Sequence, residues 1–203
     1  MAILNLTKIK TPKSLARLAK RDLENQTLSQ IANWIAKSDS SSRISTKAGV
    51  GHVIEEGYFG IKKNNTAGPD IEHLGIEVKT SPLKTGKDGK LRVKEPLSLN
   101  IINYNKEHKN AAIRSSSLYK KNKKILFVWY IHNLASLRSS YLIKYVFLWE
   151  MDRKVLGELK DDYRLILEKI RQGKANHIHQ YQHKNLTLCP KHGGTFKNPS
   201  DRK

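Results

Sequence analysis

One apolar stretch limits the fold of this chain more than any other: the seven residues from Ile125 to Ile131. The run is unbroken and follows directly on a lysine-rich segment, residues 115–124. Such a run is typical of a strand that is buried on both faces. A buried strand needs neighbouring strands and a covering layer of helices. The stretch therefore predicts a central sheet packed against helices.

Helical patterns come both before and after the predicted strands in the sequence. Thr11-Pro12 opens a first helix, with a capping residue followed by proline at the first helical position. Residues 27–30 form a capping box that opens a second helix. Apolar residues at helical spacing predict further helices over residues 47–60 and 157–172, the last one ending at Gly173.

Three further strands are predicted from alternating or apolar patterns, over residues 76–80, 97–102 and 141–149. Between the first two lies a lysine-bearing hairpin tip over residues 84–90, where Asp88-Gly89 is a favoured turn dipeptide. The order is helices, then three or four strands, then a helix. We therefore expect an α/β (α+β) fold, a mixed β-sheet flanked by helices.

The charge balance indicates a polyanionic partner. The 203-residue chain holds 38 Lys and Arg against 18 Asp and Glu, a formal net charge of +20. Such an excess concentrates polyanions near the protein, so nucleic acid is the expected partner, with a membrane surface and ribosomal RNA as rivals. No stretch approaches 18 consecutive apolar residues, which excludes a membrane span. A lone cysteine, Cys189, and no secretory signal fit a reducing cytoplasm.

One short segment carries the residues for a catalytic hypothesis. Glu77 and Lys79 lie two apart in a predicted strand, so their side chains share one face. If Asp70 folds back beside that face, two carboxylates and an ammonium group converge. Two oxygen ligands of this kind suit Mg²⁺, and a nearby lysine can orient water or offset charge on a phosphate. The pattern favours a phosphodiester-cutting centre; the alternative is an exposed strand edge whose Glu and Lys are solvated.

Two more acids precede this segment. Glu55 and Glu56 lie in the helical stretch before Asp70. Either could complete a metal shell, or both could be exposed acids on a helix.

Several motifs recur in the order that is typical of one nuclease family. The chain resembles the MutH/Sau-type endonucleases, and its restriction-enzyme branch more than its repair branch, in residues 51–60, 68–70, 74–80, 97–104, 117–127 and 186–191. The resemblance implies a restriction-endonuclease-like, MutH-like fold. It divides the chain into an N-terminal helical segment (1–46), an endonuclease core (47–192) and a flexible basic tail (193–203).

The resemblance also implies roles for individual residues. Asp70 and Glu77 would bind Mg²⁺, and Lys79 would be the lysine of the catalytic Asp…Glu-x-Lys motif. Glu56 would be the upstream acid that joins the metal site, because its spacing to Asp70 matches the family, although Glu55 keeps the distance to Gly51. A second active-site lysine corresponds to Lys121, with Lys120 and Lys123 as alternatives for that register.

DNA contacts are expected on three segments. The basic residues of the hairpin and of the segment before the buried strand would meet phosphates, and a C-terminal loop would enter the groove to read bases. Those residues are Lys84, Lys87, Lys90, Lys120, Lys123, Pro190 and Lys191.

The function implied is that of a type II restriction endonuclease. It would hydrolyse double-stranded DNA at a short palindromic site, GATC by resemblance, in the cytoplasm of a bacterium and in association with its nucleoid. A homodimer on DNA would supply the two active sites that a palindrome cut in both strands requires. The alternatives are a MutH-like nicking enzyme of mismatch repair and a non-catalytic basic DNA-binding protein.

Overall fold

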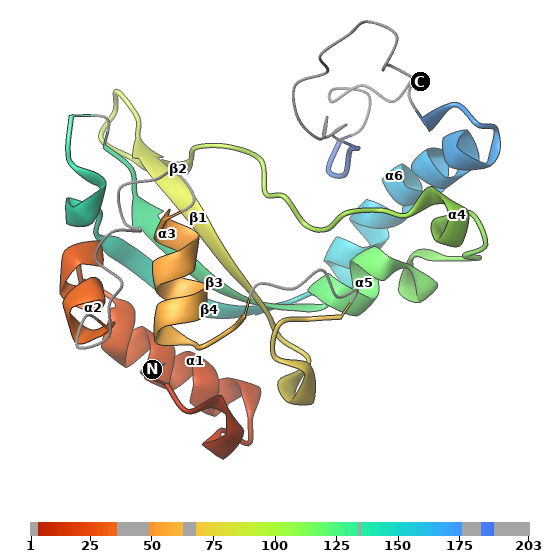
Figure 1. The fold of residues 1–203 in the computed structure, drawn as a ribbon. Coiled ribbons are helices and arrows are strands. Elements are labelled where there is room, and N and C mark those ends of the chain that lie inside the picture. The colour runs from red at the N-terminus through yellow and green to blue at the C-terminus, as the bar shows by residue number, and fades with distance from the viewer. Residues whose placement is uncertain (1–3, 36–48, 63–67, 134, 176–183, 189–203) are drawn as a thin grey trace, which may run out of the picture. The chain divides into compact units, whose positions relative to one another are not determined.

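The computed structural model forms two compact units and describes residues 4–35, 49–62, 68–133, 135–175 and 184–188 (Figure 1). The first unit comprises Met1–Ile101 and Ser117–Met151, and the second comprises Ile102–Ser116 and Asp152–Lys203. The boundaries predicted at residues 46 and 192 fall outside the described residues, so they stay predictions.

The first unit is built on a four-stranded mixed sheet in the order β2-β1-β3-β4. Its strands are β1 (Glu77–Thr85), β2 (Leu91–Val93), β3 (Lys124–Ile131) and β4 (Ile143–Glu150). β1 and β3 run parallel, whereas β2 and β4 each run antiparallel to their neighbours. The mixed sheet and its central apolar strand are therefore confirmed.

The helices of the first unit form where the capping signals and the apolar spacing predict them. They are α1 (Pro12–Leu23), α2 (Leu28–Ile35), α3 (Gly49–His52) and the π-helical η4 (Val53–Tyr58). The shorter elements of this unit are η1 (Leu6–Lys8), η5 (Glu72–Leu74), α5 (Ser117–Asn122) and η7 (Arg138–Ser140). Thr11 accepts the Ser14 N–H at 3.1 Å, as expected of an N-cap.

The two faces of this sheet have different chemistry. Val78, Leu126 and Val146 lie on the face that packs with α1, α2 and η4 into one apolar core. Because strand side chains alternate, Glu77 and Lys79 lie on the other face. An aromatic cluster on β3 and β4 shares that second face: Phe127, Trp129, Phe147 and Trp149.

The strand predicted over residues 97–102 is wrong. Residues 97–101 form no strand, and Ile101 is 81% exposed. The partner of β1 is instead β2, which pairs with residues 83–85. The Lys94 N–H still donates to the Pro82 carbonyl at 3.0 Å, but no described residue after Lys94 continues this pairing.

The second unit consists of α4 (Tyr104–Glu107), η6 (Ile113–Ser115) and the long helix α6 (Arg153–Arg171). α6 begins one turn before its predicted start at residue 157, because the Asp152 side chain caps it by accepting the Val155 N–H at 2.8 Å. The hydroxyl of Tyr163 donates to buried Glu107 at 3.0 Å. Of the helices described, none has the length and apolar character needed to cross a membrane.

A buried carboxylate on α6 organises the segment that follows the helix. Asp162 is 7% exposed and accepts backbone N–H groups from Asn185 at 2.7 Å and from Leu186 at 3.0 Å, with a longer bond of 3.3 Å from Lys184. Several donors on one carboxylate offset the cost of burying it. Asp162 therefore fixes residues 184–186 against α6.

We expect Asp162→Ala to lower the free energy of unfolding by about 1–3 kcal/mol, because three backbone donors lose a charged acceptor. Urea denaturation followed by circular dichroism measures the loss, and hydrogen exchange locates it at residues 184–186. The matched control is Asp161→Ala on the exposed side of the same helix, where we expect a change within about 0.5 kcal/mol. Equal effects of the two variants would contradict this role for Asp162.

Candidate active site

The site begins with two side chains on one face of β1. Glu77 is the first residue of the strand, and Lys79 follows two positions later. The Lys79 ammonium donates to Glu77 Oε1 at 2.7 Å. Parallel pairing with β3, from Glu77 opposite Ile125 to Leu83 opposite Ile131, holds this part of the strand in place. β1 therefore presents both residues on a rigid backbone.

Asp70 is clamped to the start of β1 by two reciprocal hydrogen bonds. Its Oδ2 accepts the Val78 N–H at 3.0 Å, and its own N–H donates to Glu77 Oε2 at 3.2 Å. The chain makes this approach through a tight turn, closed by a bridge between Ile71 and Ile76. Gly75 in that turn has φ +64°, a left-handed conformation that favours glycine.

Glu77 lies at the centre of the cluster. Only 2% of the residue is exposed. Besides Lys79, a second ammonium group approaches its Oε1, that of Lys121 at 3.6 Å. Burial raises the pKa of Glu77 above its ordinary value, and Lys79 is the strongest opposing influence. The carboxylate thus lies between the backbone of Asp70 on one oxygen and two lysines on the other.

Lys121 comes from α5, which immediately precedes β3. The buried Asn122 side chain donates to the Leu118 carbonyl at 2.9 Å, which steadies this short helix. Of the three lysines considered for this position, Lys121 lies beside Glu77, whereas Lys120 and Lys123 are exposed. The geometry therefore favours Lys121 for the register that the sequence left open.

The upstream acid is where the geometry departs from the sequence-based preference. Burial first, and then the charge of Asp70, raise the pKa of Glu55 to about 7, and Lys79 and Glu77 also act on it. Oε1 of Glu56 instead lies 2.7 Å from Nδ1 of His52, one helical turn earlier. The described interactions thus place Glu55, rather than Glu56, in the electrostatic field of the Asp70–Glu77 cluster.

The segment that carries both acids, η4, has π-helical geometry. A π-turn contains more residues than an α-turn and absorbs a single inserted residue without breaking the helix. Here the Phe59 N–H bonds to the Ile54 carbonyl, five residues back, at 3.1 Å. Glu55 and Glu56 both lie within this segment. Their spacings in the sequence, to Gly51 for Glu55 and to Gly60 for Glu56, do not choose between the two acids.

The donor set fits a divalent cation. Among the residues that the structure describes, no three His, Cys, Asp or Glu side chains already form a metal-binding group. Mg²⁺, however, is commonly held by one or two carboxylates together with water and substrate phosphate. The influence of Asp70 and Glu77 on Glu55 shows that these acids create a negative potential that a cation would neutralise. Asp70 and Glu77 are the residues that would hold it.

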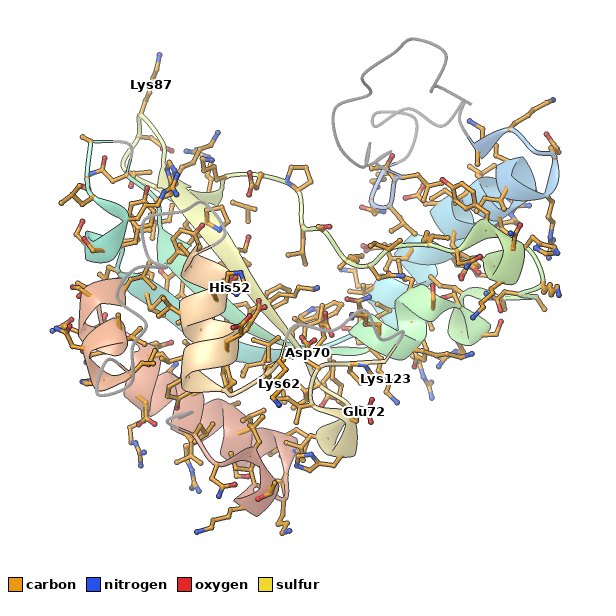
Figure 2. All side chains as sticks on the ribbon, in the orientation of Figure 1. His52, Lys62, Asp70, Glu72, Lys87 and Lys123 are labelled. Carbon is orange, nitrogen blue, oxygen red and sulfur yellow. The ribbon has the colours of Figure 1, made fainter. Side chains whose placement is uncertain are left out.

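The remaining predicted DNA-binding residues lie apart from this cluster or outside the described chain. Lys84, Lys87 and Lys90 are exposed on the β1–β2 hairpin, and Figure 2 shows Lys87 at its tip, far from Asp70. Lys123 passes over the turn at Gly75, within 3.7 Å of where a Cβ would stand. Pro190 and Lys191 lie outside the described residues.

His52 lies near the site, and sequence reasoning gave it no role. It precedes Glu56 by four positions, so the two side chains lie on one side of the helical segment. That spacing was the available signal. The histidine holds Glu56, and its charge when protonated lowers the pKa of Glu55.

Comparisons with known proteins agree with this arrangement. Residues 59–162, just over half of the chain, match the family model described as DNA mismatch repair enzyme MutH. The type II restriction enzyme Sau3AI of Staphylococcus aureus is 30% identical over 177 residues, which cover 86% of this chain and 36% of the relative. The chain thus spans about a third of the curated relative it matches. With the mixed sheet and the Asp70–Glu77–Lys79 cluster in place, the match over residues 59–162 shows that this chain belongs to the MutH family.

Proposed function

We propose that this protein is a Mg²⁺-dependent endonuclease that hydrolyses phosphodiester bonds of double-stranded DNA. The observation that carries the proposal is the environment of Glu77, a buried carboxylate contacted by the Asp70 backbone, Lys79 and Lys121. Two acids and two lysines converge at the start of one strand of a chain with a net charge of +20. The basic chain attracts the DNA, and the acidic pair suits a metal.

The carboxylates and the lysines have different roles in this proposal. Bound Mg²⁺ would supply Lewis-acid polarisation of the scissile phosphate and a more acidic water. Asp70 is oriented for that ion by the Val78 N–H, and Glu77 by the Asp70 N–H. The ammonium groups of Lys79 and Lys121 can donate to non-bridging phosphate oxygens, on which negative charge builds during attack. Because the strand and α5 fix these groups beforehand, little reorganisation is needed.

We place Glu55 as the upstream acid of this centre, in the role for which the sequence analysis preferred Glu56. The support is electrostatic, since Glu55 interacts with Asp70, Glu77 and Lys79. Glu56 then has a separate part, as the partner of His52.

Within this activity, we favour a type II restriction enzyme that cuts both strands at GATC. The relative of that class supports it, since it aligns with most of this chain. Two copies of the chain on a palindrome would provide one active site per strand, and the protein would act in the bacterial cytoplasm on nucleoid-associated or incoming DNA. The family description as a mismatch repair enzyme supports a second candidate, a nicking endonuclease.

Substitution of the carboxylates tests the proposal. We expect Asp70→Asn and Glu77→Gln to slow cleavage of a supercoiled GATC plasmid in Mg²⁺ by at least about 100-fold, because each removes a metal ligand. Binding measured by gel shift in chelator should persist, because the basic surface supplies most of the affinity. The matched control is Glu72→Gln, an exposed acid two residues after Asp70, which should cut at the wild-type rate.

The products of the same digestion separate the candidates. Linear DNA indicates the restriction enzyme, and open circles that persist indicate the nicking enzyme. If the wild-type protein shifts the plasmid but leaves it supercoiled at every Mg²⁺ concentration, it is a DNA-binding protein without this activity.

Substitution of Lys121 and of Lys120 should have different effects, the first on the cleavage rate and the second on DNA binding. We expect Lys121→Ala to lower the single-turnover rate at saturating DNA by about 100-fold, because it removes a cation beside the reacting phosphate. Lys120→Ala should change the dissociation constant and its salt dependence and leave that rate intact. Rapid-quench kinetics at saturating protein measure both variants. A Lys121→Ala enzyme with a wild-type rate at saturation would remove this lysine from the proposed centre.

Glu55 should also leave a signature in the stability of the metal-free protein. Its pKa in the folded chain is about 7, raised from an ordinary 4.5, so the folded state binds this proton more tightly. Its contribution to the free energy of unfolding therefore falls as pH rises from 4.5 to about 7. The Glu55→Gln variant has no such pH-dependent contribution. Its free energy of unfolding relative to that of the wild type should therefore increase from pH 4.5 to about 7 and then level off. Urea denaturation in chelator at several pH values between about 4.5 and 8 checks this, and parallel curves for the two proteins would contradict the assignment.

A further inference from the structure

The β1–β2 hairpin is an exposed basic feature of the first unit. Lys84, Lys87 and Lys90 are all exposed, and none forms an ion pair with another described residue. The one acid at the tip, Asp88, is held by both terminal nitrogens of Arg92 at 2.6 and 2.8 Å. Since Arg92 offsets the charge of Asp88, the hairpin presents a net charge of about three lysines.

The hairpin tip has a defined conformation. The Gly86 N–H donates to the Lys90 carbonyl at 2.8 Å, and the Gly89 N–H donates to the Gly86 carbonyl at 3.0 Å. Gly89 has φ +74°, which the Asp-Gly turn requires. The two-pronged contact between Asp88 and Arg92 spans the same turn. The lysines are therefore carried on a turn that needs little ordering when it binds a ligand.

One continuous strand joins the hairpin to the proposed active site. β1 runs from Glu77 to Thr85, and it pairs with β3 over residues 77–83 and with β2 over residues 83–85. Eight residues at about 3.3 Å each put Thr85 at most about 26 Å from Glu77. Figure 2 shows Lys87 beyond that end of the strand and Asp70 near the other end. The strand thus acts as a spacer between the two groups.

We infer that the β1–β2 hairpin binds the phosphate backbone of duplex DNA outside the cleavage site. This inference rests on the proposed function, because the distance along the duplex is counted from a scissile phosphate placed at Glu77. With the duplex axis along β1 and a rise of about 3.4 Å per base pair, a spacing of up to about 26 Å corresponds to at most about eight base pairs from the cut. Ammonium groups on long side chains suit phosphates rather than base edges, so the contact adds affinity without adding sequence preference.

The length of the duplex decides whether this contact can form. A duplex of about 10 base pairs centred on GATC extends about five base pairs from its centre and does not reach the hairpin, whereas one of about 30 base pairs does. Fluorescence anisotropy in chelator gives the dissociation constant of each duplex as a function of salt concentration. The variant is the triple substitution Lys84→Ala/Lys87→Ala/Lys90→Ala.

On the long duplex we expect the slope of log affinity against log salt to become shallower by about 2.7, or about 0.9 for each lysine. The ratio of the variant's dissociation constant to that of the wild type then falls by about 40-fold between about 50 and 200 mM salt. On the short duplex the variant should have the wild-type slope. A second triple variant, Lys84→Arg/Lys87→Arg/Lys90→Arg, keeps the charges and should restore the slope on the long duplex.

The control removes three exposed charges from another part of the first unit, in Lys8→Ala/Lys13→Ala/Arg17→Ala. It should show no dependence on duplex length. Equal slope changes on both duplexes, no change on the long one, or the same length dependence in the control would overturn the inference. Wild-type cleavage of the long duplex in Mg²⁺ is scored separately. A protein that never cuts but shows the length-dependent slope would refute the proposed function and retain the hairpin contact.

Discussion

The reciprocal pair of hydrogen bonds between Asp70 and β1 is the interaction on which the site depends. Asp70 accepts from the Val78 N–H and donates its own N–H to Glu77, so a turn and a strand are joined at the point where two carboxylates must meet. This contact can form because β2 pairs with β1 only from Leu83 onward. The first half of β1 keeps an edge that Asp70 occupies.

Around that contact the charges are arranged in opposition. Burial disfavours the ionised form of Glu77, whereas Lys79 and Lys121 favour it. Among the described residues no lysine forms an ion pair with Glu55, and burial raises its pKa to about 7. A small acidic cluster with its own cations is thereby kept within a strongly basic chain. The basic surface and the acidic cluster therefore have separate roles. The lysine-rich surface is suited to attract a polyanion, and the acidic cluster is suited to hold a cation.

Much of the fold was predictable because local patterns and tertiary packing agree. The run from Ile125 to Ile131 is a central strand, and the capping residues Thr11 and Thr27 begin α1 and α2. The failures have identifiable causes. Residues 97–102 alternate as a strand does, yet the strand that pairs with the end of β1 is β2, formed by residues 91–93. The α6 helix starts at Arg153 because Asp152 caps it, whereas apolar spacing alone predicts a start at residue 157.

The sequence by itself determined that Glu77 and Lys79 share one face, since alternation in a strand requires only their spacing. It also indicated Asp70 as their partner. Only the tertiary structure decided which neighbours join them. Glu55 and Glu56 differ by one position, and so do Lys120 and Lys121, so spacing alone could not separate them. In the folded chain Asp70, Glu77 and Lys79 act electrostatically on Glu55, Glu56 contacts His52, and Lys121 approaches Glu77. Contacts between segments distant in the chain set these orientations, and no local pattern encodes them.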